Sequence, residues 1–337
     1  MSEHTLIAID LAKSVFQVCL YDTVKNKALF NKRLSRDKLM AFIAKHASSR
    51  IVMEACYSAN FWGRSFQALG YRVDLIPAQH VKPFVVGNKT DHNDALAIAE
   101  AACRPRIRFV PVKTQSQQDI QSLHRVRERL IRSKTTLTNQ ARGLLSEYGI
   151  VFNQGHKAFT EAMVSVRESQ ALSPAMQELM QGIYEEYSSI NIRIKEINKK
   201  LENIVENDEL CQILKSMRGV GNIIASAIVS KIGDGSGFDS ARAFAVWVGL
   251  TPKQQSSGHK SMMQGISKRG DSYLRKQLVH GARVFMLHAR ESDDRLSRWV
   301  NGLIERRGYN KAAVALAHRM ARIAWTLLHK KEPYKTF

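Results

Sequence analysis

The chain has 337 residues, and 44% of them are hydrophobic, which is enough for two or three packed domains and excludes a disordered chain. Its formal net charge of +21 predicts a polyanionic partner, because such an excess of one charge otherwise only repels itself. Residues 257–337 hold 17 Lys and Arg against 6 Asp and Glu, so +11 of this charge lies in the last quarter. No apolar run is long enough to span a bilayer and no signal peptide is evident, which favours nucleic acid over an anionic membrane surface.

Cysteine usage points to a reducing compartment. The four cysteines, at positions 19, 56, 103 and 211, lie far apart and form no Cys-x-x-Cys pair, which argues against a zinc site or a disulfide scaffold. We therefore expect a cytoplasmic protein.

Residues 1–112 are predicted to form an α/β domain. Strands are expected at residues 6–9, 16–20, 51–53 and 71–75, where short apolar runs or alternating apolar residues occur. Helices are expected at residues 61–69, which Gly70 ends, and at residues 91–103, which are rich in Ala and Leu.

Four acids occupy positions in this domain from which they can converge. Asp10 and Glu54 follow predicted strands, and Asp91 and Asp94 open a helix three residues apart, so that they share one face. Clustered carboxylates repel one another unless cations lie between them, and Mg²⁺ prefers such hard oxygen ligands. Two Mg²⁺ ions about 4 Å apart can assist phosphoryl transfer, so the acids are predicted to hold two ions.

Each acid also has a simpler interpretation. Asp91 and Asp94 fit an N-terminal helix cap that compensates the helix dipole, Asp10 fits a turn, and Glu54 fits a solvated strand end. The joint order strand-Asp, strand-Glu, helix-Asp-x-x-Asp favours the metal site. This order is the pattern of RNase H-like and RuvC-like nucleases, and the N-terminal third of the chain resembles them.

Residues 113–208 are predicted to form two long helices. Leucines recur every seven residues from Leu123 to Leu144, and apolar residues keep an unbroken heptad spacing from Met176 to Ile204. Such helices pair as an antiparallel hairpin, join subunits as a coiled coil, or form a plain helical bundle. The first helix has a basic face that suits a phosphate backbone, formed by Arg125, Arg127, Arg129, Arg132 and Lys134.

Residues 209–337 are predicted to form a basic, mostly helical domain. Gly219 and Gly221 lie in a turn between two apolar stretches, where backbone N–H groups can approach a phosphate, as in a helix-hairpin-helix element.

A turn-rich loop with two adjacent serines is expected at residues 249–258. Serine attack on a phosphodiester requires nearby cations. Lys253 lies in this loop and Lys268, Arg269 and Arg275 follow it, and all four are expected to contact nucleic acid. The alternative is an inert polar linker.

Taken together, these residues resemble the DEDD-type transposases of insertion sequences, a family that includes Piv-type DNA invertases and RNA-guided bridge recombinases. The most specific motifs are Lys-Thr-Asp-x-x-Asp-Ala at residues 89–95 and Gly-Leu-Thr-Pro at residues 249–252. The resemblance extends over nearly the whole chain, and its matching stretches are residues 7–13, 53–55, 88–95, 139–149, 217–221, 244–252, 257–258 and 268–270, with Ala225, Leu274 and Arg275.

The resemblance implies a DNA recombinase. In that family the four acids bind Mg²⁺ in a RuvC-like domain, and a serine directly before a glycine is the nucleophile, which indicates Ser257 rather than Ser256. The family's two domains meet across subunits, which implies an oligomer of two to four chains. The resemblance also implies a noncoding guide RNA that pairs with double-stranded donor and target DNA, for which the basic helix face is a reasonable contact.

Three other functions remain open from the residues alone. His280 and Arg283 match the His-x-x-Arg box of tyrosine recombinases, with Tyr309 downstream, but that interpretation leaves the four acids unexplained. A RuvC-like nuclease that cuts without a covalent intermediate leaves the last third without a role. A non-enzymatic nucleic-acid-binding scaffold is excluded if the protein cleaves DNA in a metal-dependent way.

Overall fold

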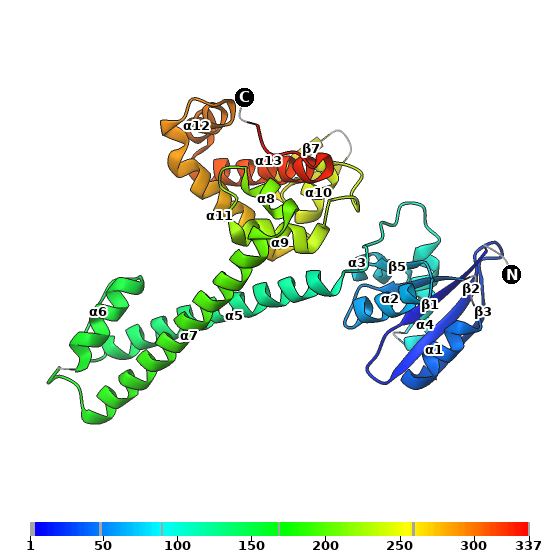
Figure 1. Ribbon diagram of the computed structural model, residues 1–337, viewed down its shortest axis with the longest axis horizontal. Coiled ribbons are helices and arrows are strands. Elements are labelled where there is room, and N and C mark those ends of the chain that lie inside the picture. The colour runs from blue at the N-terminus through cyan, green and yellow to red at the C-terminus, as the bar shows by residue number, and fades with distance from the viewer. Residues whose placement is uncertain (1–3, 47–48, 89, 168, 258–259, 336–337) are drawn as a thin grey trace. The chain divides into compact units, whose positions relative to one another are not determined.

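The structure, a computed structural model, describes residues 4–46, 49–88, 90–167, 169–257 and 260–335, with only the backbone at 260 and 261. The polypeptide forms two compact units, Met1–Gln115 and Ser116–Phe337 (Figure 1). The expected further division near residue 208 falls between two helices of the second unit and stays a prediction. None of the helices in the described part of the chain combines the length and apolar character needed to span a membrane.

The first unit is built on a five-stranded mixed sheet with the order β3-β2-β1-β4-β5. Its strands are β1 (Thr5–Asp10), β2 (Val15–Asp22), β3 (Lys27–Ser35), β4 (Arg50–Glu54) and β5 (Val73–Ile76). β1 pairs antiparallel with β2 and parallel with β4, so β1 is the central strand. The four predicted strands are confirmed. β3 was not predicted, because its residues are mostly exposed and carry no apolar alternation.

Helices cover both faces of this sheet. They are α1 (Arg36–Ala44), α2 (Ala59–Ala68), α3 (Ala78–Val81), the 3-10 helix η1 (Lys82–Phe84) and α4 (Asp91–Ala102). α1 and α2 pack on the face that carries Ile7, Ile9 and Met53. α4, formed largely from alanines, packs on the opposite face against Ala8 and Val52. The predicted helices at 61–69 and 91–103 are confirmed.

The second unit begins with two long helices, α5 (Gln115–Ser146) and α7 (Pro174–Glu206), with α6 (His156–Arg167) between them. The hydrogen bonds between α5 and α7 show that these two helices run antiparallel. Arg127 of α5 donates to Asn198 of α7, and the later residue Lys134 donates to the earlier Asn191. The heptad residues of both helices lie in one buried cluster that also includes Phe159 of α6. The two helices therefore pair within one chain. Their heptad residues are buried against each other and are not exposed to bind a second subunit.

Charges placed in this seam should unfold the helices rather than separate subunits. Ile190→Glu with Ile197→Glu would place two carboxylates in a buried cluster, and each should cost several kcal/mol. Circular dichroism should show a large drop in melting temperature. Ile192→Glu is the matched control on the same helix, since its side chain is 58% exposed and should tolerate the charge. A stable variant that only forms smaller species in light scattering would contradict this assignment.

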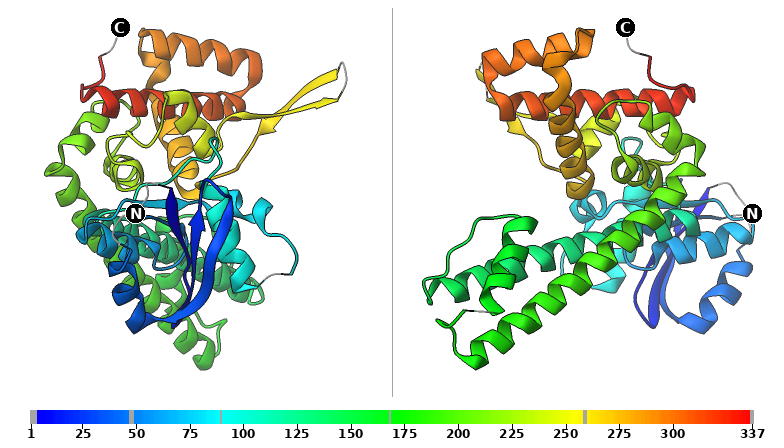
Figure 2. Two further views of the ribbon diagram at one scale, coloured as in Figure 1. Left: turned by 90° about the vertical axis from the view of Figure 1, so that its right-hand side faces the viewer. Right: turned by 60° about the vertical axis from the view of Figure 1, so that its left-hand side comes forward.

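The remaining helices surround a second core, which includes Phe244, Leu274, Phe285 and Leu316. They are α8 (Glu209–Lys215), α9 (Asn222–Ile232), α10 (Ala241–Val248), α11 (Ser272–His288), η2 (Ala289–Glu291), α12 (Arg295–Arg307) and α13 (Tyr309–Lys330). Residues 249–258 were expected as a loop, which is wrong for residues 252–257, because these form a strand. A two-stranded ribbon, β6 (Pro252–Ser257) and β7 (Lys260–Ile266), extends from the helices (Figure 2). β6 is exposed along its whole length, so its sequence has no apolar alternation from which the strand could be predicted.

Candidate active site

Asp10 and Glu54 lie side by side at one edge of the sheet. Ile9 pairs with Met53 in the parallel ladder, so the next residue of each strand is an acid, on strands about 4.8 Å apart. Side chains alternate along a strand, so Asp10 and Glu54 share the face of Ala8 and Val52, which α4 covers. The sequence prediction that these two acids converge is therefore supported by the register.

The charges of both acids act on one neighbouring thiol, that of Cys56. The chain turns directly after β4, with the Cys56 amide donating to the Glu54 carbonyl at 2.8 Å. Burial, followed by the charges of Glu54 and Asp10, raises the pKa of the Cys56 thiol to about 11. The thiol therefore stays protonated at neutral pH, and both carboxylates act on the same point.

α4 begins at the same end of the sheet. Asp10 pairs with Gln17 across β1 and β2, and Gln17 pairs with Arg33 across β2 and β3. Arg33 Nη2 lies 3.2 Å from Asp91 Oδ2. Asp91 thus contacts a side chain of β3, which lies two positions from β1 in the strand order of the sheet. Thr90 is the N-cap of α4, and its hydroxyl accepts from the Asn93 amide, so neither predicted acid is the capping residue itself.

The structure brings two of the four predicted acids together and leaves Asp91 and Asp94 in the first turn of α4. Among the described residues, no three His, Cys, Asp or Glu side chains are close enough to hold one metal ion. Mg²⁺ is commonly held by one or two carboxylates, with waters and substrate phosphates completing its octahedron. The hard oxygen donors of Asp10 and Glu54 fit such an ion.

Ser257 is the last residue of β6 and is exposed. Its backbone pairs with Lys260, and Gly258, which the family motif places after it, lies outside the described residues. Ser256 projects from the opposite face of the strand, where its Oγ accepts from Gln254 Nε2 at 3.0 Å. The two serines therefore face different surroundings, and only one of them can face a given phosphate.

The cations expected beside Ser257 lie at the other end of the ribbon. The Lys268 amide donates to the Gly249 carbonyl at 3.1 Å, at the base of the ribbon, and Arg269 follows. The six residues of β6 span about 20 Å between this base and Ser257. The expectation that Lys268 and Arg269 flank Ser257 is therefore wrong within one chain.

Two motif glycines have a structural role at this base. Gly249 and Gly270 both have positive φ, at 78° and 80°. A Cβ on Gly249 would overlap the backbone of Arg269, and a Cβ on Gly270 would overlap that of Trp247 in α10. Arg275 Nη1 donates to the carbonyls of Val248 at 2.8 Å and Arg269 at 3.2 Å. The predicted contact of Arg275 with nucleic acid stays a prediction, and in this structure its guanidinium closes the backbone junction.

The predicted helix-hairpin-helix glycines differ from each other. A Cβ on Gly219 would clash with the Gly281 carbonyl of α11, so this glycine permits close packing of the turn against a helix. Gly221 precedes α9, is exposed, and has no neighbour within 4 Å of an added Cβ. Only Gly221 therefore offers the open helix N-terminus that a phosphate requires.

The His-x-x-Arg box lies on α11 and contacts the first turn of α13. Arg283 Nη2 donates to Asn310 Oδ1 at 3.3 Å, and the neighbouring Tyr309 is 43% exposed. Burial, and then the charge of Arg283, lowers the pKa of His280.

The basic face of α5 is divided in the structure. Arg125, Arg129 and Arg132 are exposed, and Arg132 lies 3.4 Å from Glu128 on the same helix. Lys134 Nζ donates to Asn191 Oδ1 at 3.2 Å, so it holds α5 to α7. Three of the five residues of the predicted basic face are thus exposed, whereas Arg127 and Lys134 donate to asparagines of α7.

A buried polar network joins α5 to α9 and α11, and sequence reasoning missed it. His124 Nδ1 lies 2.9 Å from Tyr273 Oη, and His124 Nε2 lies 3.1 Å from Ser226 Oγ. Burial, and then the charges of Arg127 and Lys231, lowers the pKa of His124 to about 4. No local pattern could reveal this network, because the partners lie more than 100 residues away in sequence.

Because His124 is neutral when folded, we expect stability to fall as the pH drops from about 6.5 to about 4. In this window the unfolded chain binds a proton that the folded chain excludes, which costs about 1.4 kcal/mol for each unit by which the two pKa values differ. Melting temperatures of His124→Gln should fall less steeply over this window. His288→Gln, at an exposed histidine of α11, is the control; equal slopes for all three proteins would contradict the assignment.

Several known proteins similar to this chain are transposases. Residues 211–297 match the model of the transposase IS116/IS110/IS902 family, and residues 7–150 match the DEDD transposase model of IS110 type. The transposase of insertion sequence element IS1111A from Coxiella burnetii is 41% identical, over 99% of this chain and 92% of that protein. The transposase of IS1328 from Yersinia enterocolitica is also 41% identical, over 97% of each chain. The pilin gene-inverting protein of Moraxella bovis is 20% identical over 98% of this chain and 97% of its own length.

Proposed function

Because this chain belongs to the IS116/IS110/IS902 family of transposases, we propose that it cuts and rejoins DNA through a phosphoserine formed on Ser257, assisted by Mg²⁺. The observation that carries this proposal is the exposed position of Ser257 at the end of a projecting ribbon, within the matched residues 211–297. A side chain in this position can reach a duplex without moving the helical core.

The proposed reaction has two displacements. Ser257 Oγ attacks a phosphorus atom and gives up its proton, and the leaving DNA hydroxyl takes a proton as the phosphodiester bond breaks. The hydroxyl of another strand then attacks the phosphoserine, which releases Ser257 and restores a phosphodiester. The number of phosphoester bonds is unchanged, so no external energy source is needed.

The carboxylates have a binding role in this scheme. Asp10 and Glu54 would hold the first ion, and Asp91 and Asp94 would complete a site for two ions once Asp91 leaves Arg33. The Arg33–Asp91 pair is exposed on both sides, at 69% and 60%, so it is weak enough to exchange for a cation. When bound, Mg²⁺ stabilises negative charge on the phosphate oxygens.

Partners follow from the charge distribution. We propose that double-stranded donor and target DNA bind the second unit, and that a noncoding guide RNA binds the exposed arginines of α5: Arg125, Arg129 and Arg132. We further propose a working complex of two to four chains, acting at the bacterial nucleoid in the cytoplasm. Since the α5–α7 seam is filled within one chain, other surfaces would join the subunits.

A reconstituted reaction tests this function. Purified protein, RNA transcribed from the sequence that flanks its gene, and two plasmids that carry donor and target sites are incubated with Mg²⁺ or with EDTA. Sequenced junctions that appear only with Mg²⁺ are the expected result. Cut ends without junctions would favour a simple RuvC-like nuclease, and binding without cleavage would favour a scaffold.

A further inference from the structure

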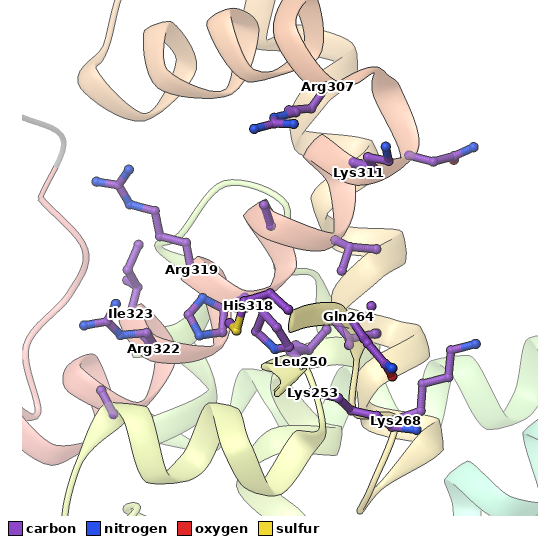
Figure 3. Close-up of a pocket in the computed structure, with 18 of the residues that line it drawn as sticks. Leu250, Lys253, Gln264, Lys268, Arg307, Lys311, His318, Arg319, Arg322 and Ile323 are labelled. Atoms are coloured by element: carbon purple, nitrogen blue, oxygen red, sulfur yellow. The ribbon is translucent and has the colours of Figure 1, made fainter. Parts of the chain in front are cut away.

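A large cationic cavity lies between the β6–β7 ribbon and α13, with a volume of about 1640 Å³. Its walls are the base of the ribbon, the end of α12 and one face of α13 (Figure 3). The cationic side chains in it are Lys253, Lys268, Arg307, Lys311, Arg319 and Arg322. None of the described residues that line it is acidic. The other lining residues are apolar or neutral, so the charged groups of this cavity are all cationic and favour an anionic ligand.

The charges on α13 form a row. Lys311, Arg319 and Arg322 recur at spacings that place them on one face of the helix. From Lys311 to Arg322 the helix rises about 16 Å. One strand of DNA carries a phosphate about every 3.4 Å along its axis, so this row matches about five phosphates.

These cations are not neutralised by the protein. In the part of the chain that the structure describes, none of the six forms an ion pair, and Arg319 lies over the Trp299 ring at 4.8 Å. Burial, and then the charges of Arg322 and Arg242, lowers the pKa of His318, so this imidazole adds no charge at neutral pH. Six unpaired cations around one cavity repel one another until an anion enters.

Lys268 has an unusual backbone conformation at the edge of this cavity. Its φ is 54°, a left-handed value that L side chains rarely adopt, and its amide is held by the Gly249 carbonyl at 3.1 Å. Strain of this kind persists where the surrounding structure fixes it, often at binding sites. Here the junction of Gly249 and Gly270 fixes it and directs the Lys268 side chain to the cavity.

We propose that this cavity binds the phosphate backbone of the DNA strand that Ser257 cuts, which adds Arg307, Lys311, Arg319 and Arg322 to the DNA-binding surface. This inference rests on the proposed function, because it assumes that Ser257 cuts the strand that the cavity holds. Lys253 lines the cavity and precedes Ser257 by four residues on β6, about 13 Å. A strand that leaves the cavity thus reaches the serine within about four nucleotides, which favours DNA over RNA as the occupant.

Salt-dependent binding to a duplex tests this proposal. Lys311→Gln with Arg322→Gln removes two exposed cations of the cavity, and Arg306→Gln with Lys330→Gln removes two exposed cations of α12 and α13 outside it. The slope of log affinity against log salt should fall by about 2 for the cavity variant, since each lost phosphate contact removes about 0.9. The control pair should keep the wild-type slope, and Lys311→Arg with Arg322→Lys should restore it. Melting temperatures check that all variants fold.

Three outcomes would overturn the proposal. Equal slopes for the cavity variant and the wild type would mean that these cations contact no DNA. A loss confined to an RNA of the same sequence would mean that the cavity is an RNA site. Equal losses for the cavity and control pairs would mean a diffuse charge effect without a site. The proposed function is judged separately, by whether the wild-type protein forms a serine adduct.

Discussion

Ser257→Ala should abolish strand joining while DNA binding persists. The alanine lacks the oxygen that forms the phosphoester, so recombination should fall by about 10⁴-fold or more, as in other enzymes that lose their nucleophile. Because Ser257 is exposed and ends a polar ribbon, the fold should be unaffected. Junction formation measured by quantitative amplification, together with a binding assay, separates the lost chemistry from lost affinity.

Ser256→Ala is the matched control for this experiment. Its Oγ accepts from Gln254 Nε2 on the other face of β6, so its removal should leave recombination within a few-fold of the wild type. If Ser256→Ala were inactive and Ser257→Ala active, the nucleophile would be Ser256 and not Ser257. An active pair of variants with an inactive Tyr309→Phe would restore the tyrosine-recombinase interpretation.

Asp10→Asn and Glu54→Gln should each abolish recombination, by about 10³-fold, because each removes one of two carboxylates that share an edge of the sheet. The amides keep the shape of the side chains but lose the negative charge that a cation requires. Without metal, either variant should melt at the same temperature as the wild type or slightly higher, since repulsion between like charges is removed.

Metal binding gives a readout that does not depend on activity. Mg²⁺ or Mn²⁺ should raise the melting temperature of the wild-type protein, because a ligand that binds only the folded state stabilises it. Either amide variant should lose this shift, whereas Asp239→Asn, an acid of the second unit, should retain it. A full shift in Asp10→Asn, or recombination at the wild-type rate, would show that these acids hold no metal.

The convergence of Asp10 and Glu54 was predictable from the sequence because it depends on local patterns. Two buried apolar runs each end in an acid, and parallel neighbours place such ends together. The position of Asp91 was not predictable, because Asp91 opens a helix that is placed by packing on the sheet, and its partner Arg33 lies on a strand that the sequence pattern did not reveal.

Long-range contacts explain the other differences. Arg275 and Lys134 look like free surface cations in the sequence, but their partners are the Val248 carbonyl and the Asn191 side chain. The heptad spacing predicted two long helices. It did not show whether these helices pair within one chain or between two chains, because that depends on α7 packing back along α5. The count of charged residues predicted a basic C-terminal region. The cavity that brings six of its cations together was not predictable, because residues of both the ribbon and α13 form it.

Direct mapping of the protein–DNA adduct tests the central claim. A substrate with a nick next to the cleavage site traps the covalent intermediate, because the cut fragment diffuses away and cannot be rejoined. After digestion, mass spectrometry should find a nucleotide phosphate on Ser257, in a Mg²⁺-dependent amount that Ser257→Ala eliminates. An adduct on Tyr309, or efficient cleavage with no adduct on any residue, would contradict the phosphoserine mechanism.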